Sequence, residues 1–278
     1  VVGKSGDAGV DITAIVKARG IPSDFPADVM EEAYMLPSEI SDAAASSYIS
    51  QGRRDLRSKN IVTIDSEDTK DVDDGISIEM LENGNYLLGV HIADVTEYVK
   101  AGSALDREAY ERGTSVYLPD RVIPMLPRSL SNGICSLNVG ETRLAFSVEM
   151  EISQDGQLVN HEIFESVIKV KYKISYNKLY ELLENNTPEL KNEFKEHINE
   201  LILMRKLAAV LKRRRDEEGS VNFDFPETKV IVDDNGETID IMPYRITFAN
   251  NIIEEFMLIC NRTVSEEFYW REIPFMYR

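Results

Sequence analysis

The chain has 278 residues, 43% of them hydrophobic, which is enough to bury a substantial core in one large domain or in one domain with a small appendage. A formal net charge of −18 argues against the simplest kind of nucleic-acid-binding protein, because such a protein neutralises phosphates with a basic surface. No apolar run approaches the ~20 residues of a membrane-spanning helix, and no signal-peptide pattern opens the sequence. We therefore expect a cytoplasmic protein without a membrane partner.

The two cysteines give no sign of a disulfide framework or a zinc site. Cys135 and Cys260 stand far apart, and neither has Cys or His neighbours at metal-ligand spacing. We expect two buried thiols.

The first 60 residues are predicted to contain short helices joined by polar connections. A short strand remnant opens the chain, and helices are expected at residues 11–19 and 26–35, the second with proline in its first turn. A polar connection rich in Ser and Ala follows. The sequence starts without Met and ends shortly after an X-Pro turn, which predicts an excised fragment.

A hydrophobic period of two marks the start of a sheet after residue 60. Residues 61–64 form a strand candidate, and apolar residues alternate again from Ile76 to Met80. Asn83-Gly84 is typical of a two-residue hairpin turn, and residues 86–93 are expected to be the returning strand.

The rest of the chain mixes helices and strands without a regular βαβ rhythm. Ser103 and Gly113 bracket a helix at residues 104–112, after which Pro119, Pro124 and Pro127 predict an extended loop. The later predicted elements are a hairpin of residues 143–152 and 157–172, a helix at 176–184, one long helix at 188–218, a strand at 221–225, a hairpin turn at 234–236 and a helix at 250–268. This order predicts an α+β fold or an irregular α/β fold, with a mixed or antiparallel sheet and packed helices.

Four aspartates in ten residues, Asp65, Asp71, Asp73 and Asp74, form the clearest candidate site. Converging carboxylates repel one another, so a cation is expected among them. A ligand set of oxygen atoms without His or Cys indicates a hard ion, Mg²⁺ or Mn²⁺, with one or two ions left open. Because carboxylate-held Mg²⁺ is the usual apparatus of phosphate-ester hydrolysis, that reaction class is predicted.

Two other interpretations of the acidic cluster were weighed. A calcium-binding EF-hand loop that started at Asp71 would need glycine at its sixth position, and Gly75 falls at the fifth. A solvated acidic turn remains an alternative, since charge runs are usually exposed, but β-branched residues lead straight into this one.

Several ordered motifs resemble the ribonuclease II/ribonuclease R (RNB) family. They are Thr63-Ile64-Asp65, Asp71-Val72-Asp73-Asp74, His91-Ile92-Ala93-Asp94-Val95, residues 112–119, 123–127 and 130–137, and Ile253-Glu254-Glu255. The resemblance covers residues 52–278 and is closer in detail to bacterial ribonuclease R than to ribonuclease II. It implies an RNB-type α+β catalytic core that is truncated. Residues 1–51 would be the end of a cold-shock (OB) region with linker helices, and residues 52–278 the N-terminal portion of the catalytic domain.

The resemblance implies a processive, Mg²⁺-dependent exoribonuclease that degrades single-stranded RNA from its 3′ end to nucleoside 5′-monophosphates. Asp65, Asp71 and Asp74 would then hold metal, and cleavage would depend on Asp73. Gly75 stands where the family more often has Ala, which is expected to loosen the backbone at the site. The family's later Arg-rich segment and S1 domain lie outside the chain, which leaves open its activity as a fragment.

The resemblance also assigns three RNA contacts, for which there are four candidate residues. Tyr117 would stack on bases, Tyr176 would lie near the scissile end, and either Glu254 or Glu255 would help to distinguish RNA from DNA. Both tyrosines have a packed, purely structural alternative.

Other residues and other functions have competing interpretations. His91 is expected to be a hydrogen-bonded core residue, whereas the basic run at residues 212–215 either touches RNA phosphates or suits the C-terminus of a helix. Rival functions are a non-catalytic RNA-binding member of the same fold and a phosphoesterase acting on small molecules. The oligomeric state, the RNA targets and any action on structured RNA stay open.

Overall fold

The computed structural model describes residues 3–4, 9–221, 228–233, 237–243 and 246–277. These residues form two compact units, and the chain passes between them several times. The first unit comprises Val1–Ser38, Val95–Ile134 and Phe223–Arg245, and the second comprises Glu39–Asp94, Cys135–Asn222 and Ile246–Arg278. The domain boundary expected near residue 52 stays a prediction. No helix in the described ranges has the length and apolar character needed to cross a membrane.

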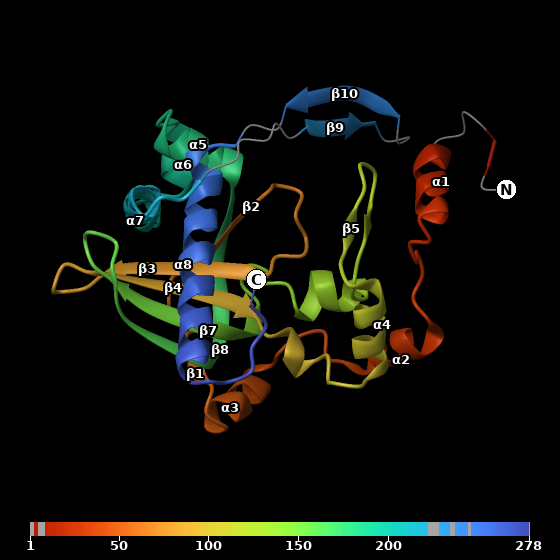
Figure 1. Ribbon diagram of the computed structural model, residues 1–278, viewed down its shortest axis with the longest axis horizontal. Helices are drawn as coiled ribbons and strands as arrows, with labels where there is room; N and C mark the ends of the chain where they lie inside the picture. The colour runs from red at the N-terminus through yellow and green to blue at the C-terminus, as the bar shows by residue number, and fades with distance from the viewer. Residues whose placement is uncertain (1–2, 5–8, 222–227, 234–236, 244–245, 278) are drawn as a thin grey trace. The chain divides into compact units, whose positions relative to one another are not determined.

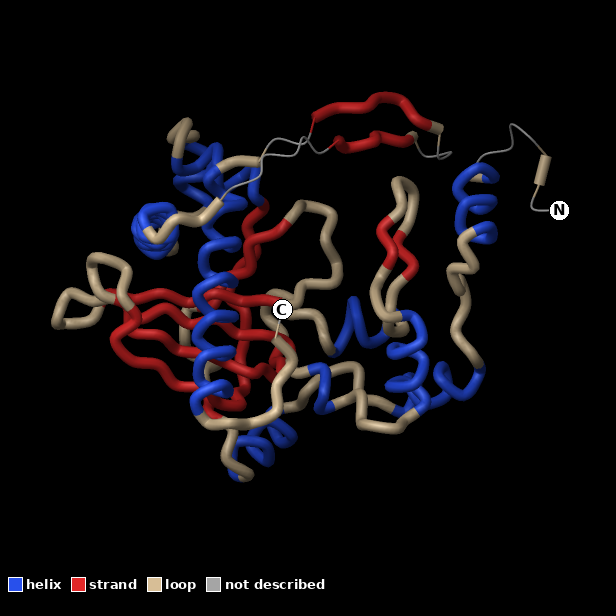
Figure 2. Tube along the Cα trace, viewed as in Figure 1, coloured by secondary structure: helices blue, strands red, loops and turns tan. Residues whose placement is uncertain are grey.

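Within the described residues, the second unit is built on a mixed sheet of six strands in the order β1-β8-β2-β3-β4-β7 (Figures 1 and 2). The strands are β1 (Arg54–Asp55), β2 (Ile61–Asp65), β3 (Asp74–Met80), β4 (Tyr86–Ala93), β7 (Thr142–Ile152) and β8 (Leu158–Ser175). The long strand β8 pairs antiparallel with β7, and it pairs in parallel with β1 and β2. Since β7 also pairs with β4, the sheet closes on itself.

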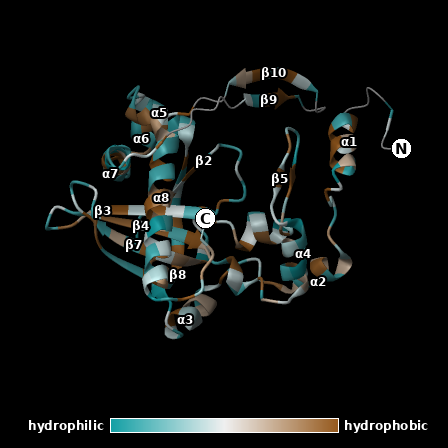
Figure 3. Ribbon diagram, viewed as in Figure 1, coloured by the Kyte–Doolittle hydropathy of each residue, from teal (hydrophilic) through white to brown (hydrophobic). Residues whose placement is uncertain are grey.

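Alternation along the strands explains the main core of this unit. Val62, Ile76 and Leu88 are almost fully buried and belong to one cluster with apolar residues of the helices α5 (Tyr176–Leu183), α7 (Ile198–Glu217) and α8 (Phe248–Trp270). In Figure 3, hydrophobic and hydrophilic residues alternate along α8, as expected of a helix with one buried face. Each fully buried Leu, Ile or Phe side chain in such a core contributes about 1.5–3 kcal/mol.

Two helix predictions for this unit were wrong. The expected long helix is divided into α6 (Pro188–Glu193) and α7, because the residues between them turn to pack on β8. Phe194 is buried, and the ring of His197 stacks on Tyr172 with centroids 3.8 Å apart. The segment expected as a polar connection contains α3 (Asp42–Ser50), capped by the Ser41 side chain, which accepts from the Ala44 N–H at 3.2 Å.

The first unit contains short elements. They are α1 (Val10–Ala18), α2 (Ala27–Met35), the 3₁₀ helix η1 (Val95–Glu97), α4 (Ala104–Arg112), β5 (Val116–Tyr117), β6 (Val122–Ile123), the π-helical turn η2 (Leu130–Ile134), β9 (Thr228–Val232) and β10 (Thr238–Pro243). Both caps expected for α4 are confirmed, since the Ser103 hydroxyl accepts from the Asp106 N–H and Gly113 has a φ of +70°. The loop after α4 is not wholly extended, because after the short strands β5 and β6 it contains the helical turn η2.

The remaining sequence predictions agree with the structure where it describes them. The helices expected at residues 11–19, 26–35, 176–184 and 250–268 match α1, α2, α5 and α8, and both predicted hairpins of the sheet are present. The opening strand remnant includes Val1 and Val2, which lie outside the described residues. So do most of the strand at 221–225 and the turn at 234–236, on either side of which β9 and β10 pair antiparallel. The α+β class with a mixed sheet is confirmed.

Candidate active site

The acidic loop, residues 66–73, joins two neighbouring strands of the closed sheet. Asp65 is the last residue of β2 and Asp74 is the first of β3, and these strands pair antiparallel. The Asp65 Oδ1 atom accepts hydrogen bonds from the Ser66 N–H at 2.7 Å and from the Thr69 hydroxyl at 3.0 Å. The sheet therefore brings the first and last aspartates of the cluster to one end of adjacent strands.

The four aspartates influence one another electrostatically. Removal of water raises the pKa of Asp74 to about 6, with further contributions from the negative charges of Asp65 and Asp73. The pKa of Asp73 is also raised, by removal of water and then by the charges of Asp71 and Asp65, although much of its side chain is exposed. The predicted cluster is thus a set of carboxylates that share one electrostatic environment.

This environment fits a hard cation. The Asp74 Oδ2 atom is buried and accepts no hydrogen bond within the protein, which is costly for a carboxylate unless a cation lies beside it. Oxygen-only donors are those that Mg²⁺ and Mn²⁺ prefer. In the part of the chain that the structure describes, however, no three His, Cys, Asp or Glu side chains already converge on a metal position. A bound ion would therefore have to draw these carboxylates closer together.

Two residues that hydrogen-bond to the acidic loop were not predicted from the sequence to have a role there. Lys173, on β8, donates from Nζ to the Thr69 carbonyl oxygen at 2.7 Å. The Ser136 hydroxyl contacts the loop backbone at Lys70 and Val72. Ser136 belongs to one of the family motifs. Nothing in the sequence around Lys173 indicates a contact with the loop, because that contact depends on the parallel pairing of β2 and β8.

Tyr176 lies close in the fold to the first aspartate of the cluster. It is the first residue of α5 and directly follows Ser175, which is the partner of Asp65 in the β2–β8 pairing. The ring is partly buried and packs against the main core. Its position is compatible with the predicted RNA contact, and its packing also gives it a structural role.

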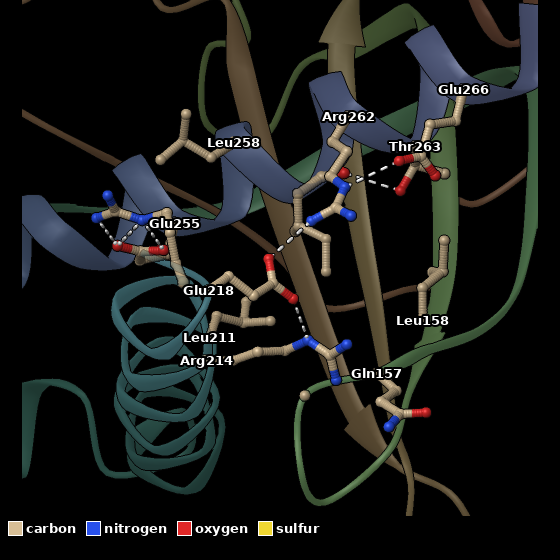
Figure 4. A pocket seen from close by; sticks show the side chains of 13 residues that line it. Gln157, Leu158, Leu211, Arg214, Glu218, Glu255, Leu258, Arg262, Thr263 and Glu266 are labelled. Carbon is tan, nitrogen blue, oxygen red and sulfur yellow. Dashed lines mark hydrogen bonds and ion pairs between the residues drawn. The ribbon is translucent and has the colours of Figure 1, made fainter. Parts of the chain in front are cut away.

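The structure distinguishes between the two adjacent glutamates of α8. Glu255 is 3% exposed and forms an ion pair with Arg215, whose Nη2 donates to Oε1 at 2.6 Å, while Glu254 is exposed. Figure 4 shows the Glu255 side chain where α8 meets α7. Glu254 is thus the one of the pair that is accessible to a ligand.

Glu255 also lines a pocket of about 300 Å³ beside α7 and α8. The charged groups of this pocket bind one another, because Glu218 forms ion pairs with both Arg214 and Arg262 (Figure 4). Two residues of the basic run at 212–215, Arg214 and Arg215, are therefore engaged within the protein. This favours the helix-end interpretation for these two.

Tyr117 belongs to the first unit and lies on β5. Its side chain is 66% exposed, so it is not packed in a core beside the prolines of its loop. An exposed aromatic ring is suited to stacking on nucleic-acid bases.

The residues expected to be structural are confirmed as such. His91 is fully buried, and its ring nitrogens make hydrogen bonds with the hydroxyls of Ser77 and Ser147 at 3.0 and 2.8 Å. Cys135 and Cys260 are free buried thiols, and burial raises the pKa of each to about 12. A thiol with so high a pKa stays protonated at neutral pH.

Comparison with known proteins identifies the family. A model described as "RNB domain" matches residues 53–278. Ribonuclease R of Thermotoga maritima is 47% identical over an alignment that includes the whole of this chain but only 39% of the relative, so the chain spans well under half of its length. The structure of Mycoplasma genitalium RNase R in complex with ribose-methylated single-stranded RNA is 29% identical with a TM-score of 0.88, covering 98% of this chain and 41% of that one.

A more distant likeness concerns the fold alone. The structure of yeast Ssd1, a pseudonuclease, has a TM-score of 0.71 at 20% identity and covers 97% of this chain and 32% of that one. The extent of the family match and the identity to ribonuclease R show that the chain belongs to the RNB-domain family.

Proposed function

We propose that the chain forms the metal-binding part of an exoribonuclease that shortens single-stranded RNA from its 3′ end in the cytoplasm and releases nucleoside 5′-monophosphates. The observation that carries the proposal is the coupled group of aspartates, with the buried and unpaired Oδ2 of Asp74, in a chain of the RNB-domain family. Processive action and the use of Mg²⁺, with Mn²⁺ as a substitute, are parts of the same proposal.

The roles proposed for the aspartates are those that the family resemblance implies, and their exposure and positions support them. Asp65, Asp71 and Asp74 would hold the ion, because the first and last stand at fixed strand ends and Asp71 lies between them on the acidic loop. Carboxylate-held Mg²⁺ supplies charge stabilisation for a phosphoryl oxygen and lowers the pKa of an attacking water. Asp73 is the exposed member of the cluster, which supports the proposal that its carboxylate meets the RNA and the water at the scissile bond.

The proposed RNA contacts use groups that are accessible in the structure. The exposed ring of Tyr117 would stack on a base without regard to its identity, and Tyr176 would pack beside the terminal nucleotide. Glu254 would accept a hydrogen bond from a 2′-hydroxyl, since Glu255 already binds Arg215. Such a contact would favour RNA over DNA.

The test follows a 5′-labelled single-stranded RNA incubated with Mg²⁺ and either this chain or the longer gene product that contains it. Asp73→Asn should abolish stepwise shortening from the 3′ end, because it removes one negative charge without changing the volume of the side chain. Asp68→Asn is the matched control, since Asp68 is an exposed carboxylate of the same loop that is not assigned to the metal.

The outcomes separate the candidate functions. Stepwise shortening by the longer product, lost in Asp73→Asn and kept in Asp68→Asn, supports the exoribonuclease. RNA that is bound and left intact by the unmodified protein would refute it in favour of the non-catalytic RNA-binding function. Hydrolysis of a small phosphodiester that is insensitive to Tyr117→Ala, without any action on RNA, would instead indicate a small-molecule phosphoesterase.

A further inference from the structure

The Ser136 side chain joins two backbone groups of the acidic loop. Ser136 is fully buried, and its hydroxyl donates to the Lys70 carbonyl oxygen at 2.8 Å while it accepts from the Val72 N–H at 3.1 Å. These two backbone groups lie on either side of Asp71. One hydroxyl therefore fixes the peptide groups that flank a proposed metal ligand.

The backbone after Asp71 is fastened as well. The Leu137 N–H donates to the Val72 carbonyl oxygen at 2.8 Å, and the Ala93 N–H of β4 donates to the Asp73 carbonyl oxygen at 2.9 Å. The Val72 side chain is buried in a small core cluster that includes Leu137. The loop thus carries its carboxylates on a backbone that is bound from Lys70 to Asp73.

Ser136 is itself held by the sheet. The guanidinium of Arg143, on β7, is almost fully buried, and its Nε donates to the Ser136 carbonyl oxygen at 2.8 Å. Because β7 is a member of the closed sheet, the position of Ser136 is set by the same framework that positions β2 and β3. A shift of the loop relative to the strand ends would break these bonds.

A hydroxyl at this position can make both loop contacts. It is donor and acceptor at once, whereas alanine is neither and a thiol is weak in both roles. The need is physical, since neighbouring carboxylates of like charge repel one another, which favours a loop that spreads outward. We propose that Ser136 is a positioning residue, which holds the acidic loop so that Asp71 and Asp73 face the metal position. This inference rests on the proposed function.

A purely structural role for Ser136 is the rival explanation, and Ser147 provides the matched control. Ser147 is also a fully buried serine, and its hydroxyl bonds to His91 at 2.8 Å and Ser166 at 2.7 Å. None of these partners belongs to the acidic loop. Ser147→Ala therefore removes a buried hydroxyl of the same kind from the same unit without touching the loop.

The first experiment measures Mn²⁺ binding to the chain by titration calorimetry, beside its stability in urea. Loss of groups that orient metal ligands typically weakens metal affinity by about 10–100-fold. We expect Ser136→Ala to weaken Mn²⁺ binding by about tenfold or more, and Ser147→Ala to change it less than about twofold. Equal Mn²⁺ affinities in wild type and Ser136→Ala would overturn the inference, as would equal losses in the two alanine variants. If Ser136→Ala does not fold, Ser136→Cys, which keeps only a weak donor and acceptor in a somewhat larger side chain, is judged by the same comparison.

A second measurement separates this inference from the proposed function. In the longer gene product, Ser136→Ala should raise the Mn²⁺ concentration needed for half-maximal RNA shortening and leave the KM for RNA unchanged at saturating Mn²⁺. Wild-type protein that binds Mn²⁺ but does not shorten RNA would refute the exoribonuclease and leave the role of Ser136 to the binding titration. Wild-type protein that binds no Mn²⁺ would refute both.

Discussion

The buried imidazole of His91 should make the fold less stable in mild acid. Burial, with a smaller contribution from the charge of Lys59, lowers the pKa of His91 to about 3, against about 6.5 in an unfolded chain. Between pH 7 and pH 5 the unfolded state therefore takes up a proton that the folded state does not. Stability that is present above pH 6.5 is lost as the pH falls, by about 2 kcal/mol at pH 5.

Asp74 acts in the opposite direction in the metal-free protein. Its pKa is raised to about 6 in the folded state, against about 3.9 in an unfolded chain, so the folded state binds the extra proton between these values. Acidification from pH 7 to pH 5 then adds about 1 kcal/mol of stability. Asp73, whose pKa is also raised, adds stability in the same direction. The wild-type change is therefore smaller than the contribution of His91 alone.

Variants separate the two contributions. Urea unfolding would be measured at pH 7 and pH 5 in EDTA for the wild type, His91→Gln and Asp74→Asn. His91→Gln should be less stable than the wild type at pH 7, because Gln does not reproduce both serine contacts, yet it should gain stability on acidification. Asp74→Asn should lose more stability than the wild type over the same interval.

The quantity compared is the change in each protein's free energy of unfolding between pH 7 and pH 5. A loss of stability that is equal at both pH values therefore does not affect the comparison. If His91→Gln and the wild type change by the same amount between pH 7 and pH 5, the buried imidazole is not the group that responds. Saturating Mg²⁺ should make the change of the wild type between pH 7 and pH 5 resemble that of Asp74→Asn, since a bound cation keeps the Asp74 carboxylate ionised at both pH values.

Three further substitutions test the packing, the ion pair of α8 and a helix cap. In Gly75→Ala the new Cβ would lie 2.9 Å from the Ile61 Cγ2, so thermal unfolding should show a loss of about 1–3 kcal/mol, and an unchanged midpoint would contradict this. Arg215→Leu leaves Glu255 buried and unpaired and should lower the stability in urea by about 3 kcal/mol; an unchanged unfolding midpoint would contradict this. Ser41→Ala should lose about 1 kcal/mol through the N-cap of α3, whereas Ser41→Asp should not.

The strands were predictable because they alternate, and the failures were helices that lack a strong pattern. The helix α3 has few large apolar residues, and only Ala45 is fully buried in it, so its sequence resembles a polar connection. Between α6 and α7, the rings of Phe194 and His197 pack against the ring of Tyr172, which lies on the strand β8. Periodicity along one helix contains no information about such a partner.

In the candidate site, too, features that depend on neighbouring residues were predictable, and features that depend on contacts between distant residues were not. The four aspartates were predictable because they are neighbours in sequence. At Gly75 the sequence predicted only a looser backbone, whereas the structure also shows that Ile61 and Leu137 pack against this residue. The choice between Glu254 and Glu255 required the position of Arg215 on another helix. Ser136 was visible in the sequence only as a member of a motif, because its role depends on how the sheet closes.

The pairing of β8 has a consequence for the order in which the domain is completed. Asp65 finds its partner Ser175 across a long stretch of chain, and the loop after Asp65 is fastened by segments that are synthesised later. Contacts between residues so distant in sequence require a large loop to be closed before they stabilise anything, which makes them late and slow events in folding. The hairpin of β3 and β4, by contrast, joins neighbours and can form early. Asp65 and Asp71 are thus synthesised early in the second unit and reach their final positions late, whereas Asp74 belongs to the early hairpin.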